Sequence, residues 1–588
     1  MDGEERFEGV GVSPGVAMAP AFVYRSAELR LPRRTLGAPG EAEGEWSRLR
    51  DARDSTARDI RRTLVALDLE TSGGEGGILE AHLMALEDEL FIKELRDEIF
   101  KMGRNAEWAV SEVASRYAAK LRSSGNELLA ERAGDIDDVA RRLLQSLMGV
   151  DSTPQFSFEG RRIVVAGNLS PSETLALPRD RVVGVALDRG GATSHAALLV
   201  RAIGIPAVFG LGNFSSRVRS GDEVALDGNG GVAILSPGAG ETGRLRSMEA
   251  ERGNLVEMAR RRAAEPAVTP DGVEVAFLAN VENEGDVAGI AASGGAGVGL
   301  FRTEYLWLAE GRPVAEERQA EIYTAMAREL GDRPFAIRAF DLGGDKFHGS
   351  ASVGEHEANP FLGLRSIRFL LRNENFFKTQ IRAVLRAGAA TGRRLDFTIP
   401  MVSDMSEIVK TRELIRETAD SFARHGVECI EPRLGIMVEV PAAAVSAAAF
   451  ARHCDYFSIG TNDLAQYTLA VDRCSESVAT LYQPLHPAVL RLVRGTVEAA
   501  CAASIGVSVC GEMAADPLSA IVLLGLGVRT FSMAPAAIPL VKETVRRVPH
   551  SEAARVVQII EGAATAAQVR HFARGVLARF APEILRQC

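Results

Sequence analysis

The residues best suited to chemistry in the C-terminal half of this sequence are arginines and carboxylates that end short apolar runs. Guanidinium groups bind phosphate and carboxylate oxygens in pairs, so several of them facing one pocket suit a small ligand with two or three negative charges. A single arginine or glutamate at a strand end is more often half of a structural ion pair, and only convergence from several strands favours a site. The residues are Arg302 and Glu304, Arg338 and Asp341, Glu439, Asn462 and Asp463, and Cys510 and Glu512, with Arg365 and Arg473 in the segments that follow.

Two of these carboxylates, Glu439 and Asp463, offer the oxygen ligands that Mg2+ prefers and leave positions for substrate oxygens and water. Cys510 lies in the sequence Val509-Cys-Gly-Glu512. A lone cysteine is a small buried hydrophobe about as often as not, but the glycine that follows would let a ligand approach the thiol closely. The pattern predicts a magnesium-assisted site for a small anion, with a thiol beside it.

A second candidate centre is His195, within Gly190-Gly-Ala-Thr-Ser-His-Ala-Ala197. The glycines favour a tight turn, Thr193 or Ser194 can cap the helix expected next, and the histidine then falls in its first turn. The positive end of a helix disfavours imidazolium, which keeps the ring nucleophilic, and stabilises a phosphoryl group attached to it. A core or capping histidine is the ordinary alternative, but this turn favours a histidine that carries phosphate.

Short apolar runs after Pro270, each followed by a helical segment, indicate the scaffold of the first site. Eight such units in about 300 residues predict a (β/α)8 barrel of the TIM type, in which chemistry lies at the carboxyl ends of the strands. The runs are Val273 to Asn280, Val298 to Glu304, Phe335 to Asp341, Leu395 to Met401, Leu434 to Glu439, Tyr456 to Asp463, Val507 to Glu512 and Thr530 to Pro535.

The residue pattern of the N-terminal part changes twice along the chain. Strand-like runs with Gly and Pro occupy residues 9–24 and return after Arg161, whereas residues 40–147 carry long stretches with helical spacing. A charged segment at 238–264, followed by two prolines, is typical of a linker helix. We therefore predict a multidomain α/β protein with an α/β domain of residues 1–37 and 148–237, an inserted helical domain of residues 38–147, a linker helix at 238–270 and the barrel at 271–588.

Composition restricts the class of protein. A chain of 588 residues with 25% charged residues fits several globular domains and excludes a disordered or fibrous protein. The net charge of -10 is spread along the chain, so we expect no nucleic-acid partner, and no apolar run approaches membrane-spanning length. The acidic N-terminus lacks the pattern of a secretory signal, and the cysteines lack zinc or disulfide spacing. We expect a cytoplasmic protein with reduced thiols.

Motifs along the chain carry a more specific signal. They are Gly190–Ala197, Gly297–Glu304, Asp341–Lys346, Asn359–Arg365, Gly435–Pro441, Phe457–Arg473 and Cys510–Glu512. Together they resemble enzyme I of the bacterial sugar phosphotransferase system, the phosphoenolpyruvate-protein phosphotransferases, from about Gly9 to Cys588. The stretch from Ser458 to Arg473 is highly specific to this family and its relatives.

The resemblance implies a role for each candidate in the barrel. The barrel would bind phosphoenolpyruvate, with Mg2+ held by Glu439 and Asp463. Cys510 would protonate the methylene carbon as enolpyruvate becomes pyruvate. Substrate binding would fall to Arg302, Arg338, Asn462, Asp463 and Arg473.

In the N-terminal part, the resemblance implies a swivelling domain in which His195 is phosphorylated and Arg201 and Thr193 support the phosphohistidine. The helical insert would dock the phosphocarrier protein HPr through the regions Glu80 to Glu89 and Glu131 to Asp135, whose acidic and apolar faces suit a basic partner. An exposed charge stripe is by itself usually a solvated surface. A homodimer through the barrel is implied by the resemblance alone.

Three positions depart from the family pattern. Ala192 replaces a common arginine, Leu364 a tryptophan and His486 a common serine. None of these changes removes a proposed catalytic group, but Ala192 lies close to His195 in the sequence and affects expectations about rate and partner choice.

Other functions fit part of the pattern. A pyruvate phosphate dikinase or phosphoenolpyruvate synthase shares the histidine and barrel modules but needs an ATP-binding domain, for which this sequence has neither room nor a Gly-rich phosphate loop. A non-catalytic regulatory scaffold would use His195 only as a signal, and the complete set of barrel residues argues against it. The carrier could serve sugar uptake or a nitrogen-linked regulatory branch. No sensory domain precedes Gly9, which favours sugar uptake.

Overall fold

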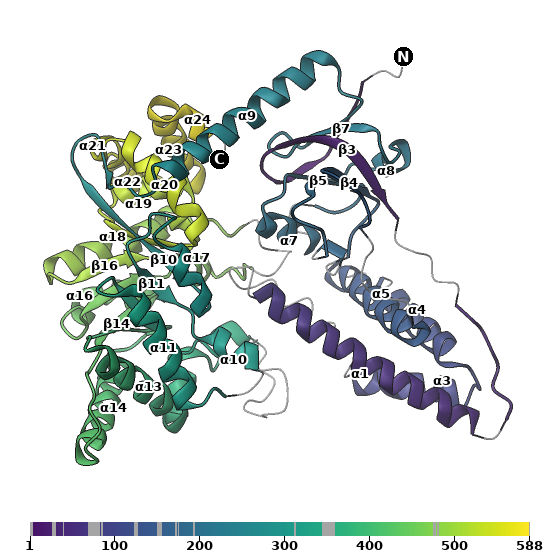
Figure 1. Ribbon diagram of the computed structural model, residues 1–588, viewed down its shortest axis with the longest axis horizontal. Coiled ribbons are helices and arrows are strands. Elements are labelled where there is room, and N and C mark those ends of the chain that lie inside the picture. Colours follow the sequence, from purple (N-terminus) through teal and green to yellow (C-terminus); the bar gives the residue numbers. More distant parts are fainter. Residues whose placement is uncertain are drawn as a thin grey trace. The chain divides into compact units, whose positions relative to one another are not determined.

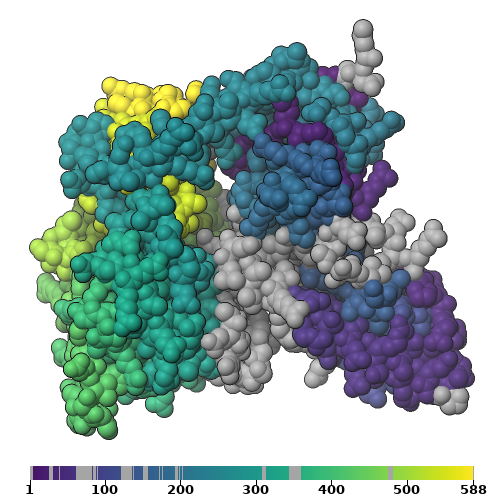
Figure 2. Space-filling view, in the orientation of Figure 1, coloured from purple at the N-terminus to yellow at the C-terminus, as the bar shows by residue number. Residues whose placement is uncertain are grey.

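Two compact units divide the chain, Met1–Ala250 and Glu251–Cys588. In Figure 1 and Figure 2 the first unit is coloured from purple to blue and the second from teal to yellow. Each unit has its own sheet and its own hydrophobic core. The computed structural model of the protein describes residues 4–25, 31–38, 40–68, 83, 86, 88–122, 127–149, 156–170, 173–174, 176–191, 195–310, 313–343, 359–473, 478 and 481–586.

The first unit is built on a mixed sheet whose described strands follow the order β1-β8-β7-β3-β4-β5-β6-β2. Strands β3 to β6 are parallel neighbours. Parallel strands are buried on both faces, which explains the continuous apolar run Ile163-Val-Val-Ala166 in β4. The bounds are β1 Glu5–Glu8, β2 Val10–Ser13, β3 Val16–Tyr24, β4 Arg162–Ala166, β5 Val182–Leu187, β6 Ala207–Phe209, β7 Glu223–Asp227 and β8 Val232–Leu235.

A helical bundle is inserted between β3 and β4 (Figure 1). Its described helices are α1 Glu41–Asp68, α3 Glu89–Phe100, α4 Ala106–Arg122 and α5 Glu127–Met148. Their apolar faces form one core, and Asp88 caps the start of α3 by accepting from the backbone N–H of Phe91. The bundle thus interrupts the α/β sheet in sequence, and its described residues contribute no strand to that sheet.

Helix α7, His195–Ile203, joins the sheet and the bundle of the first unit. Ala197 and Val200 belong to the core against the sheet, whereas Leu199 belongs to the core of the bundle. The short helix α8, Phe214–Arg217, follows β6, and the long helix α9, Ala239–Arg261, leads into the second unit. The residue predicted to carry phosphate therefore begins a helix that is packed on two sides.

The second unit is a closed barrel of eight described parallel strands, as predicted. It closes because β10 pairs with both β11 and β17, and the two-residue strand β9, Ala267–Val268, pairs antiparallel with β10. Phe277, Phe335, Phe397, Phe457 and Phe531 lie buried in the barrel core. The strands are β10 Glu274–Val281, β11 Val298–Phe301, β12 Phe335–Arg338, β13 Asp396–Ile399, β14 Arg433–Val438, β15 Tyr456–Ile459, β16 Gly506–Val509 and β17 Thr530–Met533.

Helices surround the barrel, and one of them, α19, is buried along its whole length. A capping box between Asp404 and Glu407 fixes the start of α14, and Asp516 caps α19. Among the described residues, no helix is both long and apolar enough to cross a membrane. The helices are α10 Glu304–Glu310, α11 Glu316–Leu330, α12 Ser366–Arg372, α13 Glu374–Thr391, α14 Met405–Arg424, α15 Pro441–Val445, α16 Ala447–Phe450, α17 Thr461–Leu469, α18 Pro487–Ala502, α19 Pro517–Gly525, α20 Ile538–Arg547, α21 His550–Ala553, α22 Val556–Gly562, α23 Ala566–Phe580 and α24 Pro582–Leu585.

Candidate active site

Arg338 and Glu304 form the buried centre of a charge cluster at the carboxyl end of the barrel strands. Arg338 is the last residue of β12, and Glu304 is the first residue of α10, just after β11. The two side chains form a close ion pair, and Asp341 lies 3.6 Å from the same guanidinium. Burial alone would lower the pKa of Arg338, but Glu304 and Asp341 hold that pKa above its ordinary value. Arg338 therefore stays charged inside the barrel.

Arg365 extends this cluster to two further segments. Its Nη2 donates to both carboxylate oxygens of Asp341 at 3.1 Å and to Oδ2 of Asp463 at 3.3 Å. Its Nη1 donates to the hydroxyl oxygen of Tyr467 at 3.3 Å. Asp341 also accepts a hydrogen bond from the hydroxyl of Ser366. One buried guanidinium thus ties the segment after β12 to the first turns of α17.

Glu439 and Asp463, the predicted magnesium ligands, are both buried. Oε1 of Glu439 accepts from the backbone N–H of Met401 at 2.7 Å. Burial raises the pKa of Glu439, and the negative charges of Asp463 and Asp341 raise it further. A divalent cation would stabilise the ionised form of Glu439 against these neighbouring negative charges, so the donor set fits Mg2+.

Glu439 and Asp463 would provide only part of the coordination shell of a metal ion. No cluster of three or more His, Cys, Asp or Glu side chains that could hold a metal ion is present among the described residues. Mg2+ is commonly bound by one or two carboxylates, with water and substrate oxygens in the other positions. A metal at Glu439 and Asp463 would therefore depend on the substrate to complete its ligands.

Asn462, Arg473 and Glu512 lie at the more open side of the same site. The amide of Asn462 donates to Oε1 of Glu512 and accepts from the backbone N–H of Glu512, both at 2.9 Å. Arg473 lies 3.8 Å from Asp463 and 3.5 Å from Glu512. The structure thus brings Arg473 beside the buried Asp463, and Glu512 lies next to both Arg473 and Asn462.

Arg302 is held by a residue that sequence reasoning missed. Its Nη1 donates to Oε1 of Glu282 at 3.1 Å, and both side chains are largely buried. Burial raises the pKa of Glu282 to about 7; the charge of Arg302 opposes the shift and that of Glu304 adds to it. Glu282 follows β10 directly, so its place after the apolar run was the available signal.

Cys510 follows β16 and is buried in the barrel, where it contacts Leu300 and Met437. Its Sγ lies 3.2 Å from the hydroxyl oxygen of Ser458, which donates to it. Burial raises the pKa of the Cys510 thiol, and the hydrogen bond from Ser458 opposes that shift. The thiol is therefore protonated at neutral pH, as a proton donor must be.

The glycine after Cys510 makes room for protein rather than for ligand. A Cβ built on Gly511 would lie 2.0 Å from Oγ1 and 2.7 Å from the backbone nitrogen of Thr461, and 3.0 Å from Oδ1 of Asn462. The backbone of Gly511 has φ -77°, which any residue adopts, so the need for glycine is steric. Gly511 brings the Cys510 segment against the start of α17.

Gly511→Ala should consequently displace the start of α17 from the thiol segment. We expect pyruvate formation to fall by about 10- to 100-fold, because small displacements in a site cost this much, and stability to fall by ~1–3 kcal/mol. Steady-state pyruvate release and urea denaturation measure the two effects. Gly495→Ala is the matched control, since a Cβ there meets nothing within 4 Å; equal behaviour of the two variants would contradict the steric account.

His195 is the first residue of α7, as the turn chemistry predicted. Thr193 lies outside the described residues, and so do Ala192 and Ser194. Arg201 lies in the last turn of α7, and its Nε donates to the carbonyl oxygen of Val12 at 3.1 Å. His195 and Arg201 thus belong to opposite ends of the same helix.

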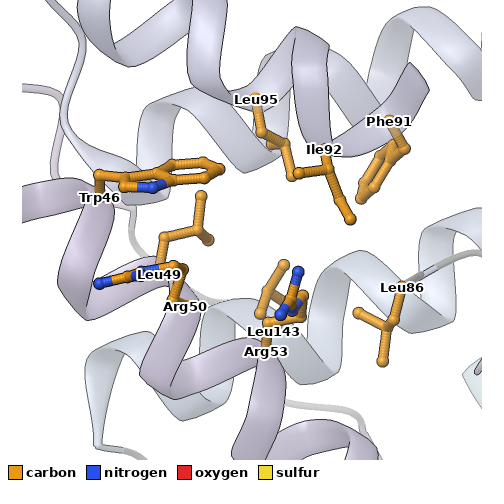
Figure 3. Close-up of a pocket in the computed structure, with 9 residues that line it drawn as sticks. All are labelled: Trp46, Leu49, Arg50, Arg53, Leu86, Phe91, Ile92, Leu95 and Leu143. Carbon is orange, nitrogen blue, oxygen red and sulfur yellow. The ribbon is translucent and has the colours of Figure 1, made fainter. Parts of the chain in front are cut away.

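The two regions predicted to dock a partner are described only in part. Within Glu80 to Glu89, Leu83 and Leu86 are buried in the core of the bundle, and Glu131 to Asp135 lies in α5. A small hollow in the bundle has a volume of about 10 Å³, close to the minimum for one water molecule, so it does not suit an organic ligand. Figure 3 shows its lining residues, Trp46, Leu49, Arg50, Arg53, Leu86, Phe91, Ile92, Leu95 and Leu143.

Three sequence families match successive parts of the chain. The PEP-binding domain of PEP-utilising enzymes matches residues 256–550, their N-terminal domain residues 8–132 and their mobile domain residues 158–231. The first match spans the barrel and its cluster of arginines and carboxylates. The third spans α7 and His195.

Curated relatives match nearly the whole chain. A phosphoenolpyruvate-protein phosphotransferase of Geobacillus stearothermophilus is 35% identical over 580 residues, which cover 97% of this chain and 98% of the relative. A protein of the same name from Staphylococcus aureus is 35% identical over 534 residues, 90% of this chain and 92% of the relative. One from Staphylococcus carnosus is 35% identical over 554 residues, 93% and 95% respectively.

Proposed function

Since the chain belongs to the phosphoenolpyruvate-protein phosphotransferase family, the enzymes I, we propose that it phosphorylates His195 from phosphoenolpyruvate, releases pyruvate and passes the phosphoryl group to a histidine of HPr. The observation that carries the proposal is the convergence of Arg338, Arg365, Glu439 and Asp463 in one buried cluster at the carboxyl end of the barrel. This reaction would be the first step of sugar uptake by a phosphotransferase system.

Substrate binding relies on the arginines. Arg302, Arg338 and Arg473 come from three separate segments, so their guanidinium groups can take the phosphate and the carboxylate of phosphoenolpyruvate from different sides. Arg338 and Arg302 are already oriented by Glu304 and Glu282. Such preorganised charges stabilise the charge that spreads over the transferring phosphoryl group without reorganising during the reaction.

Glu439 and Asp463 are the residues that we propose to hold Mg2+. When bound, the ion supplies charge neutralisation for the phosphate and carboxylate oxygens. The two buried carboxylates lie close enough to interact, and the charges of Arg338 and Arg365 oppose the effect of the neighbouring carboxylates on Glu439. Asn462 would orient the substrate through its amide while Glu512 holds that amide in place.

Phosphoryl transfer must reach a residue of the other unit. His195 lies in the first unit and the barrel residues in the second, so we propose that the α/β domain of residues 1–37 and 148–237 swivels between the barrel and the partner protein. The linker at 238–270, which contains α9, would be the hinge. The first turn of α7 would stabilise the phosphohistidine, with Thr193 and Arg201 as its predicted support.

The remaining expectations are parts of the same proposal. HPr would bind the inserted domain of residues 38–147 through Glu80 to Glu89 and Glu131 to Asp135. A homodimer through the barrel and a cytoplasmic location also stay predictions. The alternatives are a carrier of a nitrogen-linked branch and a dikinase-like reaction.

Acceptor dependence separates these alternatives. Purified protein with phosphoenolpyruvate and Mg2+ should release about one equivalent of pyruvate. Further turnover should require HPr, because His195 must pass on its phosphoryl group before it can react again. Addition of AMP and pyrophosphate should change nothing. Continued turnover without a protein acceptor, or turnover driven by AMP, would contradict the proposal, and turnover with a nitrogen-branch carrier alone would reassign the partner.

A further inference from the structure

Ser458 has no assigned role, although its side chain lies against the proposed proton donor. It is the third residue of β15, and Cys510 follows the neighbouring strand β16. Ser458 is 1% exposed and Cys510 is 4% exposed, so both groups are shielded from bulk water. The 3.2 Å contact is therefore a hydrogen bond within the barrel interior.

The described contacts of Sγ distinguish the two states of the thiol. The Ser458 hydroxyl donates to Sγ, and Sγ itself lies 3.6 Å from the carbonyl oxygen of Ile459, an acceptor for the thiol proton. When the proton leaves, the contact with Ile459 loses its donor. The Ser458 contact becomes charge-assisted instead, and such bonds are about twice as strong as neutral ones.

Charges around the thiol come from three other strands. Glu439, after β14, opposes a negative charge on Sγ, whereas Arg338 on β12 and Arg302 after β11 favour it. These charges therefore act on Sγ in opposite directions. The hydrogen bond from Ser458 acts directly on the sulfur atom.

A second set of hydrogen bonds fixes the backbone beside the thiol. Nδ2 of Asn280 donates to the carbonyl oxygen of Cys510 at 3.0 Å, and Oγ of Ser532 donates to Oδ1 of Asn280 at 2.6 Å. These residues lie on β10 and β17. Cys510 is thus held by a hydrogen bond to its sulfur from β15 and by a hydrogen bond to its backbone carbonyl oxygen from β10.

We propose that Ser458 is a positioning residue that aims the Cys510 thiol and stabilises the thiolate that remains after protonation of enolpyruvate. This inference rests on the proposed function. In the step, the enolate re-forms its carbonyl group, the methylene carbon takes the thiol proton to become the methyl group of pyruvate, and the S–H electron pair stays on sulfur. Water returns a proton to the thiolate when pyruvate leaves.

Ser458→Ala tests this role in three readouts. Removing the donor should raise the pKa of the Cys510 thiol, seen as a shift to higher pH in its alkylation rate, followed by mass spectrometry of the Cys510 peptide in the full chain. Pyruvate formation in a single turnover should slow by about 10- to 100-fold, the usual effect of a lost hydrogen bond to a charged group. The solvent deuterium isotope effect on that step should increase.

Two further variants make the test selective. Ser458→Thr retains the hydroxyl and should restore the native alkylation profile. Ser519→Ala removes another buried hydroxyl of the second unit, one that bonds Asp516 and does not contact Sγ, and it should leave the thiol pKa in place. A shift of the alkylation profile in Ser458→Thr, or a shift in Ser519→Ala equal to that in Ser458→Ala, would overturn the inference.

The outcome is distinguishable from failure of the proposed function. If the native chain forms no phosphohistidine, the function is wrong, whereas the alkylation profile of the substrate-free protein still reports on the hydrogen bond. If the native chain is phosphorylated and Ser458→Ala slows pyruvate formation without moving the thiol pKa, Ser458 is merely structural and the inference is wrong.

Discussion

Arg338→Met should abolish pyruvate formation, with a loss of at least about 10³-fold, and should also destabilise the barrel. The guanidinium compensates Glu304 and Asp341 inside the barrel. Removing one partner of a buried ion pair leaves an uncompensated charge, which costs ~3–5 kcal/mol of unfolding free energy. Activity should fall further than stability alone explains, because the same guanidinium is proposed to hold the substrate phosphate.

Pyruvate release and urea denaturation of the same preparations measure both effects. Arg318→Met is the matched control, since Arg318 is an exposed arginine that pairs with Glu284 at 3.2 Å. Surface pairs of this kind contribute less than about 1 kcal/mol. An Arg338→Met variant that retains more than about a tenth of the native activity would contradict the assignment of Arg338 to the substrate.

Glu439→Gln should separate catalysis from stability, because the two depend on its charge in opposite ways. The amide keeps the carbonyl oxygen that accepts from Met401 but is a poor magnesium ligand, so activity should fall by at least about 10³-fold at every Mg2+ concentration. Without metal the variant should be more stable than the native protein at neutral pH, by ~1–3 kcal/mol. The gain reflects the loss of a charge that burial and Asp463 disfavour.

The sign of the pH dependence follows from the raised pKa of Glu439. Below about pH 4.5, the ordinary pKa of a glutamate, the carboxyl group is neutral in both the folded and the unfolded chain. Glu439 then contributes nothing to the difference in stability between the native protein and the variant. As the pH rises towards the elevated folded value, the native protein alone loses stability. Urea denaturation at several pH values in the presence of a chelator measures the difference. An exposed control, Glu284→Gln, should show none, and a native protein that is the more stable one at neutral pH would contradict the account.

The barrel could be predicted from the sequence because each strand is an apolar run that ends in polar residues. Those polar residues also explain the errors in the boundaries. The run from Val298 to Glu304 continues past the end of β11 at Phe301, and the run from Val273 to Asn280 stops one residue before the end of β10. Polar side chains near a strand end form part of the site. Their positions therefore do not mark the residue at which backbone pairing stops.

The residues of the site could be predicted from the sequence more readily than the contacts between their side chains. Types and positions indicated Arg338, Glu439 and Asp463, but nothing in the sequence showed that Arg302 would pair with Glu282. Serine is common inside strands, so the contact of Ser458 with Cys510 required coordinates. Gly511 was predicted to let a ligand approach, but the close approach there is made by the protein itself. The group that approaches it is Thr461, a pairing between distant segments that spacing cannot reveal.

Phosphate transfer from labelled phosphoenolpyruvate to the purified chain tests the central claim most directly. With Mg2+, the native protein should retain label that is labile in acid and stable in base, as a phosphohistidine is, and His195→Ala should retain none. The variant should keep the native fold, since Ala197, Leu199 and Val200 still anchor α7 in the two cores of the first unit. Label that persists in His195→Ala, or no label on the native chain, would contradict the account.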